Sequence, residues 1–288
     1  MTLYSRRDVL RTSAYLSGLG LLHALDLFAI SKTKQFKIGA CDWSINQMGK
    51  PEAFAVAKQI GLDGVQVSLG TAANNMQLRQ PEKQQQYRQA ARQAGLAIGG
   101  LAIGELNNVP YKSAPETEQW VSDAMTVARN LGVKVILLAF FEKGDLLKDS
   151  SGQQEVIRRL RKVVPQAEKA GVILGIESWL SARESKDLVD AVNSKNVRVY
   201  YDVANSTQMG YNIYDEIRWL GKEYICEIHA KENGSLLGQG KIDFKAVRRA
   251  LDAIGYTGWI QIEGAVPPKQ AMLESYQANN KFIRSIFS

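Results

Sequence analysis

The stretch Val172-Ile-Leu-Gly-Ile-Glu-Ser178 decides the fold, because three later segments repeat its plan. Each segment is a short run of β-branched, aromatic or other apolar residues that ends near one residue able to bind a metal ion. The later segments are Val197-Arg-Val-Tyr-Tyr-Asp-Val203, Tyr224-Ile-Cys-Glu-Ile-His-Ala230 and Gly258-Trp-Ile-Gln-Ile-Glu-Gly264. Such runs are typical of buried strands, and a stretch long enough for a helix separates each from the next. This alternation predicts a parallel sheet.

Four metal-type ligands fall at the ends of these strands, and parallel strands present those ends at one edge of the sheet. They are Glu177, Asp202, His229 and Glu263. One such carboxylate alone would be interpreted as half of a surface ion pair. Four residues at equivalent points of consecutive strands instead indicate a site for one divalent ion such as Mn, Mg, Co or Zn.

The same alternation extends outward from Phe36 to the end of the chain. Strands are predicted at 37–45, 64–69, 97–104, 134–141, 172–178, 197–203, 224–230 and 258–263. Helices are predicted at 51–60, 82–94, 116–131, 153–170, 185–193, 213–221, 244–254 and 270–286. Eight β-α units in about 250 residues match the length of an α/β fold of one domain, a (β/α)8 TIM barrel over residues 36–288.

An open doubly wound sheet is the alternative fold. It would place a glycine-rich phosphate loop after the first strand. The segment Ala40-Cys-Asp-Trp-Ser-Ile-Asn46 contains no such loop, which favours the barrel. Cys41 and Cys226 fall in predicted strands one and seven, which are not neighbours in a closed barrel, so we expect no disulfide between them.

Four motifs carry a resemblance to a known family: Gly175-Ile-Glu-Ser178, Tyr200-Tyr-Asp-Val-Ala-Asn205, Glu227-Ile-His-Ala-Lys-Glu232 and Ile260-Gln-Ile-Glu-Gly264. With them the chain resembles the xylose-isomerase-like TIM-barrel superfamily and, within it, the sugar phosphate isomerase/epimerase group. The resemblance implies that Glu177, Asp202, His229 and Glu263 hold one divalent metal ion, with manganese the first choice and Mg, Co or Zn as alternatives. Endonuclease IV shares the barrel but needs several more histidines, so a DNA-repair role is disfavoured.

The resemblance also implies the chemistry. Glu177 and Glu263 would act as base and acid in proton transfer through a metal-bound enediolate, which makes the chain an isomerase or epimerase of a small carbohydrate. A lyase or dehydratase acting on a keto-sugar or 3-keto-glycoside would use the same first step. A non-catalytic carbohydrate-binding barrel would be expected to have lost part of the metal set, which is intact here. The sequence leaves open whether the barrel forms a homo-oligomer.

Several other residues at predicted strand ends are candidates for substrate contact. Trp43 could stack on a sugar or simply pack at the barrel mouth. Lys231 could bind a hydroxyl or be a solvated loop lysine, and Asn205 replaces a histidine of similar ketose 3-epimerases. Phe140 and Phe141 are expected to pack between the barrel and its helices. The full set of substrate candidates is Trp43, Glu105, Asn108, Glu142, Asn205 and Lys231.

The N-terminal segment carries a separate signal. Ser5-Arg-Arg-Asp-Val-Leu10 resembles a twin-arginine export motif, and polar residues interrupt the apolar stretch that follows. This predicts an export signal over residues 1–33, a periplasmic or exported protein and no stable membrane anchor once the signal is removed; the alternative is an ordinary amphipathic helix. The net charge of +7 comes without a Lys/Arg-rich run interleaved with aromatics, so no nucleic-acid partner is expected.

Overall fold

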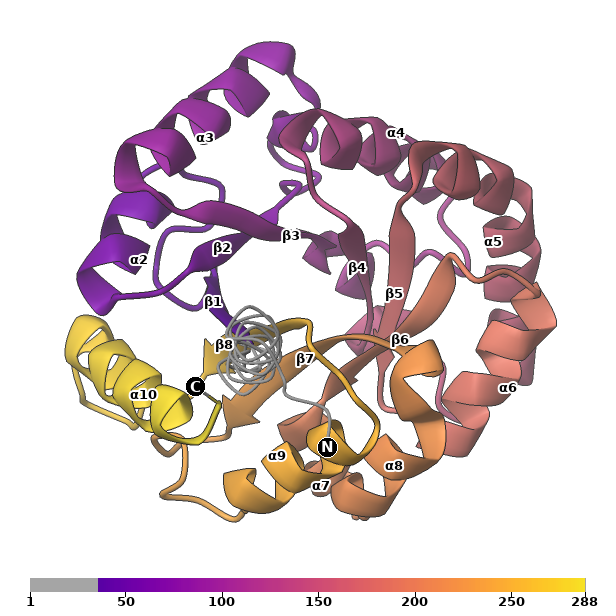
Figure 1. Cartoon of the computed structure of the whole chain (residues 1–288). Helices are drawn as coiled ribbons and strands as arrows, with labels where there is room; N and C mark the ends of the chain where they lie inside the picture. Colours follow the sequence, from indigo (N-terminus) through magenta and orange to yellow (C-terminus); the bar gives the residue numbers. More distant parts are fainter. Residues whose placement is uncertain (1–35, 288) are drawn as a thin grey trace, which may run out of the picture. The chain divides into compact units, whose positions relative to one another are not determined.

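The computed structural model describes residues 36–287, and these form one closed barrel of parallel strands (Figure 1). The strand order follows the chain, and β8 pairs with β1 to close the barrel. The predicted single-domain (β/α)8 barrel is therefore confirmed. Within this part of the chain, no helix combines the length and the apolar character needed to cross a membrane. The predicted export segment 1–33 lies outside the described residues.

The strands alternate with helices that surround the barrel in Figure 1. The strands are β1 (Lys37–Cys41), β2 (Gly64–Ser68), β3 (Ala97–Ile103), β4 (Val135–Phe140), β5 (Ile173–Ser178), β6 (Val197–Asp202), β7 (Ile225–Glu232) and β8 (Trp259–Gly264). The α-helices are α2 (Ala53–Ile60), α3 (Pro81–Ala94), α4 (Glu116–Leu131), α5 (Ser150–Ala170), α6 (Ala182–Val192), α7 (Val203–Gln208), α8 (Ile213–Tyr224), α9 (Phe244–Ala253) and α10 (Met272–Phe287). Short 3-10 helices, η1 (Gln77–Arg79), η2 (Gly104–Asn107) and η3 (Glu142–Gly144), follow β2, β3 and β4.

Two elements differ most from their prediction, and both for local reasons. The first strand ends at Cys41 because the next side chain, Asp42, accepts hydrogen bonds from the amides of Gly49 (3.1 Å) and Ser68 (3.0 Å), which turns the chain away from the sheet. Helix α7 was not predicted at all. It begins directly after β6 because the Asp202 side chain caps its first amides, the usual way in which an aspartate starts a helix.

The main apolar core lies between the strands and the helices, and a second, smaller apolar cluster on β3, β4 and β6 lies beside a column of polar side chains. The Gln66 amide donates to the Tyr200 hydroxyl (3.1 Å), which donates to Glu227 Oε2 (3.0 Å). Register shifts next to Gln66 and Tyr200 interrupt the β2–β3 and β6–β7 pairings, and such bulges re-aim side chains. A Cβ atom at Gly100 would lie only 3.3 Å from Gln66 and 3.4 Å from Glu227, so a glycine there leaves room for this polar column.

Candidate active site

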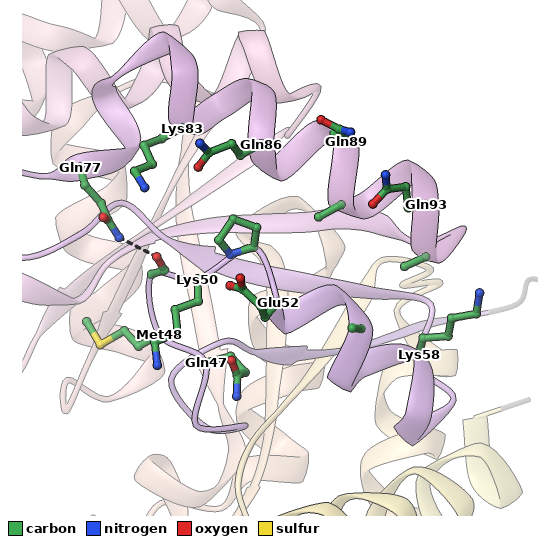
Figure 2. Close-up of a pocket in the computed structure, with 15 residues that line it drawn as sticks. Gln47, Met48, Lys50, Glu52, Lys58, Gln77, Lys83, Gln86, Gln89 and Gln93 are labelled. Carbon is green, nitrogen blue, oxygen red and sulfur yellow. Dashed lines mark hydrogen bonds between the residues drawn. The ribbon is translucent and has the colours of Figure 1, made fainter.

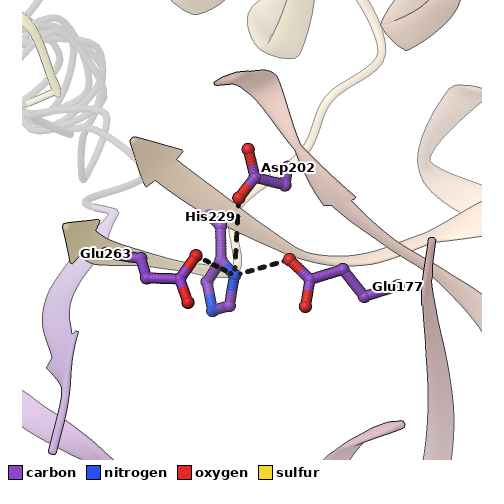
Figure 3. A group of neighbouring side chains, drawn as sticks. All are labelled: Glu177, Asp202, His229 and Glu263. Carbon is purple, nitrogen blue, oxygen red and sulfur yellow. Dashed lines mark hydrogen bonds and ion pairs between the residues drawn. The ribbon is translucent and has the colours of Figure 1, made fainter. Parts of the chain in front are cut away.

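The four predicted ligands meet at the carboxyl ends of β5, β6, β7 and β8 (Figure 3). One ligand atom from each lies within 4.8 Å of all the others. The Nδ1 atom of His229 is central: it lies 2.9 Å from Glu177 Oε1, 3.5 Å from Glu263 Oε2 and 3.9 Å from Asp202 Oδ2. Three carboxylates and one imidazole nitrogen thus converge on a volume the size of a single ion.

The two carboxylate oxygens of Asp202 have different surroundings. Its Oδ1 accepts from the amides of Ala204 (2.7 Å) and Asn205 (2.8 Å), while Oδ2 is buried and has no hydrogen-bond partner. Burial raises the pKa of Asp202 to about 7, although Lys231 opposes the shift. A buried carboxylate oxygen that faces two further carboxylates is costly without a cation. The donor set and this orphaned oxygen therefore fit a divalent metal ion.

The imidazole of His229 is oriented from inside the barrel. Its Nε2 lies 2.8 Å from Gln66 Oε1, and an amide oxygen only accepts, so Nε2 carries the hydrogen in this contact. The Gln66 amide is itself fixed because its nitrogen donates to Tyr200. Nδ1 then keeps its lone pair for a metal ion, the arrangement by which a second shell sets the tautomer of a histidine ligand.

Both oxygens of Glu263 are engaged. The indole nitrogen of Trp43 donates to Oε1 (2.9 Å) and the Lys231 ammonium donates to Oε2 (3.0 Å). Burial alone would raise the pKa of Glu263, but His229, Lys231 and Trp43 outweigh it and lower that pKa to about 2. Glu263 is therefore an ionised carboxylate held in one orientation at the edge of the ligand group.

A cavity of about 410 Å³ opens above the four ligands. All six residues predicted to contact substrate line it, together with Glu177 and Glu263. The structure therefore brings Trp43, Glu105, Asn108, Glu142, Asn205 and Lys231 together at the barrel mouth. Lys231 is not the solvated loop lysine that the sequence left as an alternative, because its side chain is 23% exposed and paired with Glu263.

One cavity residue, Phe141, was misplaced by the prediction from the sequence, and Trp179 was not predicted. Phe140 packs in the core as predicted, but Phe141 lines the cavity and stands against Trp179, with ring centroids 5.3 Å apart. Asn107 holds the start of this segment, since its Oδ1 accepts from the Phe141 amide (2.9 Å). Gln66 was missed as well; its one signal was a polar residue within the apolar run Gly64-Val-Gln-Val-Ser68.

A larger hollow of about 1250 Å³ lies between the loop after β1 and helix α3 (Figure 2). Its polar lining is mainly amide and lysine side chains, among them Gln47, Gln77, Gln86, Gln89 and Gln93. Glu52 is the one carboxylate among the described residues that line it, and no histidine joins it there. This hollow lacks the paired acid–base groups of the barrel mouth, so the barrel mouth is the candidate active site.

A family model described as "Xylose isomerase-like TIM barrel" matches residues 54–286. The chain belongs to this family. Its curated relatives include a 2-epi-5-epi-valiolone 7-phosphate 2-epimerase of Actinoplanes sp., 27% identical over 76% of this chain and 82% of that protein. A putative L-ribulose-5-phosphate 3-epimerase of Escherichia coli is 25% identical over 79% of this chain and 88% of that protein.

Solved structures share the fold. The D-psicose 3-epimerase of Clostridium cellulolyticum H10, solved with D-tagatose, superposes with a TM-score of 0.75 at 19% identity, covering 88% of this chain and all of that one (100%). At this level of identity the similarity establishes the barrel and not the substrate. The relatives named above are carbohydrate epimerases, which supports an enzyme.

Proposed function

We propose that this protein is a divalent-metal-dependent sugar isomerase or epimerase that transfers a proton at a carbon next to a carbonyl. The observation that carries the proposal is the placement of Glu177 and Glu263 on either side of the His229 imidazole, at the floor of the cavity (Figure 3). Two carboxylates that face a substrate from opposite sides can remove a proton on one face and return one on the other.

The four ligands Glu177, Asp202, His229 and Glu263 would hold the ion, with manganese as the proposed metal. When bound, a divalent ion supplies Lewis acidity that polarises a carbonyl and stabilises the charge left after proton removal. Glu263 enters this chemistry ionised and already oriented by Trp43 and Lys231, so it accepts a proton without first losing one. The rings of Trp43, Phe141 and Trp179 line the cavity and offer apolar surface to the faces of a sugar.

Proton–deuterium exchange tests the proposal. The manganese-loaded protein is incubated in deuterated buffer with a panel of ketoses and keto-glycosides, and label at the carbon next to the carbonyl is followed by NMR. We expect exchange that disappears after chelation and returns with manganese. Absence of exchange with every sugar, in protein that retains its metal, would contradict the proposal and favour a carbohydrate-binding barrel.

The same experiment separates proton transfer from elimination. A lyase or dehydratase acting on a keto-sugar or 3-keto-glycoside would begin with the same proton removal and then expel a group from the neighbouring carbon. Release of an alcohol or of water, with an unsaturated product, would identify that reaction. Recovery of an isomer or epimer with retained atoms would identify the proposed one.

A further inference from the structure

The cavity is acidic although the chain is basic. Glu105, Glu142, Glu177 and Glu263 line it, and Lys231 is the one cationic side chain among its described lining residues. The whole chain has a net charge of +7, so the acidity is a local property of the barrel mouth. A sugar phosphate brings a charge of about −1.5 to −2 into such a cavity and needs positive partners there.

The positive charge of Lys231 is already paired with carboxylates of the chain and is not available to a phosphate. Its ammonium lies 3.0 Å from Glu263 Oε2 and 3.9 Å from Asp202 Oδ2. With a divalent ion bound, the ion and Lys231 together balance the three ligand carboxylates. Glu105 and Glu142 then remain as uncompensated negative charge.

Two helix N-termini near the last strands, those of α7 and α9, are also occupied. Phosphate sites in TIM barrels commonly use loops and helix N-termini near the last strands. Here Asp202 accepts from the first amides of α7, and Asp243 accepts from the amides of Lys245 (2.9 Å) and Ala246 (3.0 Å) at the start of α9.

A carboxylate also occupies a backbone amide in the loop between β7 and α9. Glu232 Oε1 accepts from the Lys241 amide at 2.8 Å. The chain's own carboxylates thus occupy donor positions at the start of α7, at the start of α9 and in this loop.

We infer that this site takes an uncharged carbohydrate, a free ketose or a keto-glycoside, and discriminates against its phosphorylated form. The inference rests on the proposed function and narrows it to a substrate class. Glu105 follows β3 and Glu142 follows β4, so both stand at the mouth away from the metal ligands. Glu105 already accepts from the Ala72 amide (3.1 Å) and from Asn108 Nδ2 (3.2 Å). The remaining acceptor capacity of the two carboxylates suits sugar hydroxyls, and their negative charge would repel a phosphate.

Matched pairs of sugars test this. L-ribulose is compared with L-ribulose 5-phosphate, and D-psicose with D-psicose 6-phosphate; a methyl 3-keto-glucoside is added as a neutral glycoside. Binding to the manganese-loaded protein is measured by calorimetry at low ionic strength, and deuterium exchange is measured in parallel. We expect at least one neutral sugar to bind ten-fold or more tightly than its phosphate. Equal or tighter binding of a phosphate, or no binding by any neutral sugar, overturns the inference.

Charge variants test the role of the two glutamates. The double variant Glu105→Gln/Glu142→Gln should bind the phosphorylated sugar less poorly. We expect the ratio of the dissociation constants of the phosphorylated and the neutral sugar to fall at least three-fold. Glu223→Gln is the matched control, since Glu223 is exposed and precedes β7 at the other end of the barrel. An unchanged preference in the double variant overturns the role given to Glu105 and Glu142.

The readouts separate this inference from the proposed function. Neutral sugars that bind selectively but exchange no deuterium would remove the proton-transfer function and leave the substrate class standing. Phosphorylated sugars that exchange as fast as neutral ones would leave the function standing and overturn the substrate class.

Discussion

Gln66 on β2 holds His229 on β7 across the inside of the barrel, with 2.8 Å between Gln66 Oε1 and His229 Nε2. The four candidate metal ligands all come from β5 to β8, yet the orientation of their single imidazole is set from the other half of the barrel. The centre is thus a property of the closed barrel and not of its last four strands alone.

Replacing Gln66 by leucine should weaken metal binding. Gln66→Leu removes the acceptor that keeps the hydrogen on Nε2, and loss of such a second-shell partner typically costs about 10–100-fold in metal affinity. Affinity is measured by competition with a chromophoric chelator. The matched control is Gln84→Leu, another buried glutamine that bonds the Leu78 carbonyl (3.0 Å) far from the ligands. If Gln66→Leu binds the metal ion as tightly as Gln84→Leu does, Gln66 does not orient His229.

Glu177→Gln should keep the fold and abolish turnover. The amide preserves the shape of the side chain but cannot accept a proton as a base, and a general base typically contributes about 10²–10⁴-fold to the rate. Turnover is assayed with saturating manganese so that weaker metal binding does not explain the loss, and circular dichroism checks the fold. Wild-type turnover under these conditions would remove Glu177 from the catalytic role.

Metal binding should release protons and strengthen as pH rises. Burial lowers the pKa of His229, but the carboxylates of Glu177 and Glu263 hold it above its usual value; the pKa of Asp202 is raised to about 7, mainly by burial. Both groups hold protons near neutral pH in the metal-free protein and must lose them to become ligands. Apparent affinity should therefore rise between about pH 6 and 8, by roughly ten-fold per pH unit for each proton released.

Calorimetry in buffers with different ionisation enthalpies measures this release directly. A binding enthalpy that does not change with the buffer would mean that no proton leaves, and that His229 is already neutral before the ion arrives.

Export is a prediction from the sequence alone, since Arg6 and Arg7 lie outside the described residues. We expect Arg6→Lys/Arg7→Lys to retain the protein in the cytoplasm, because a twin-arginine signal depends on that pair. Fractionation of cells that express either form, with a blot for the barrel, checks this. Undiminished periplasmic signal from the double variant would show that the segment is not a signal of this kind.

The barrel and the meeting of Glu177, Asp202, His229 and Glu263 could be predicted because each of these residues closes an apolar run, and runs of this kind repeat at the spacing of β-α units. The error at β1 arose from one side chain: Asp42 bonds Gly49 and Ser68, and residues that close a strand by long-range contacts leave no local signal. Helix α7 is six residues long, too short for a helical periodicity to show.

The inner residues of the site were harder to predict. Both faces of a strand in this barrel are buried, so alternation of polar and apolar residues does not mark which side chain points inward. Gln66 and Tyr200 are brought together by register shifts in two separate strand pairings, and such shifts depend on the partner strands. Phe141 was assigned to the core on hydrophobicity alone, which does not distinguish a core aromatic from one at a cavity wall.

The divided carboxylate of Asp202 has a consequence for the redesign of this scaffold. One of its oxygens anchors the helix that carries Asn205, and the other faces the candidate ion site, so α7 and a bound ion would share one carboxylate. On the proposed function, changes on α7 would therefore disturb metal binding together with sugar binding. New sugar preferences are better sought in the short segments after β3 and β4, where Glu105 and Glu142 project from strands that supply no ligand.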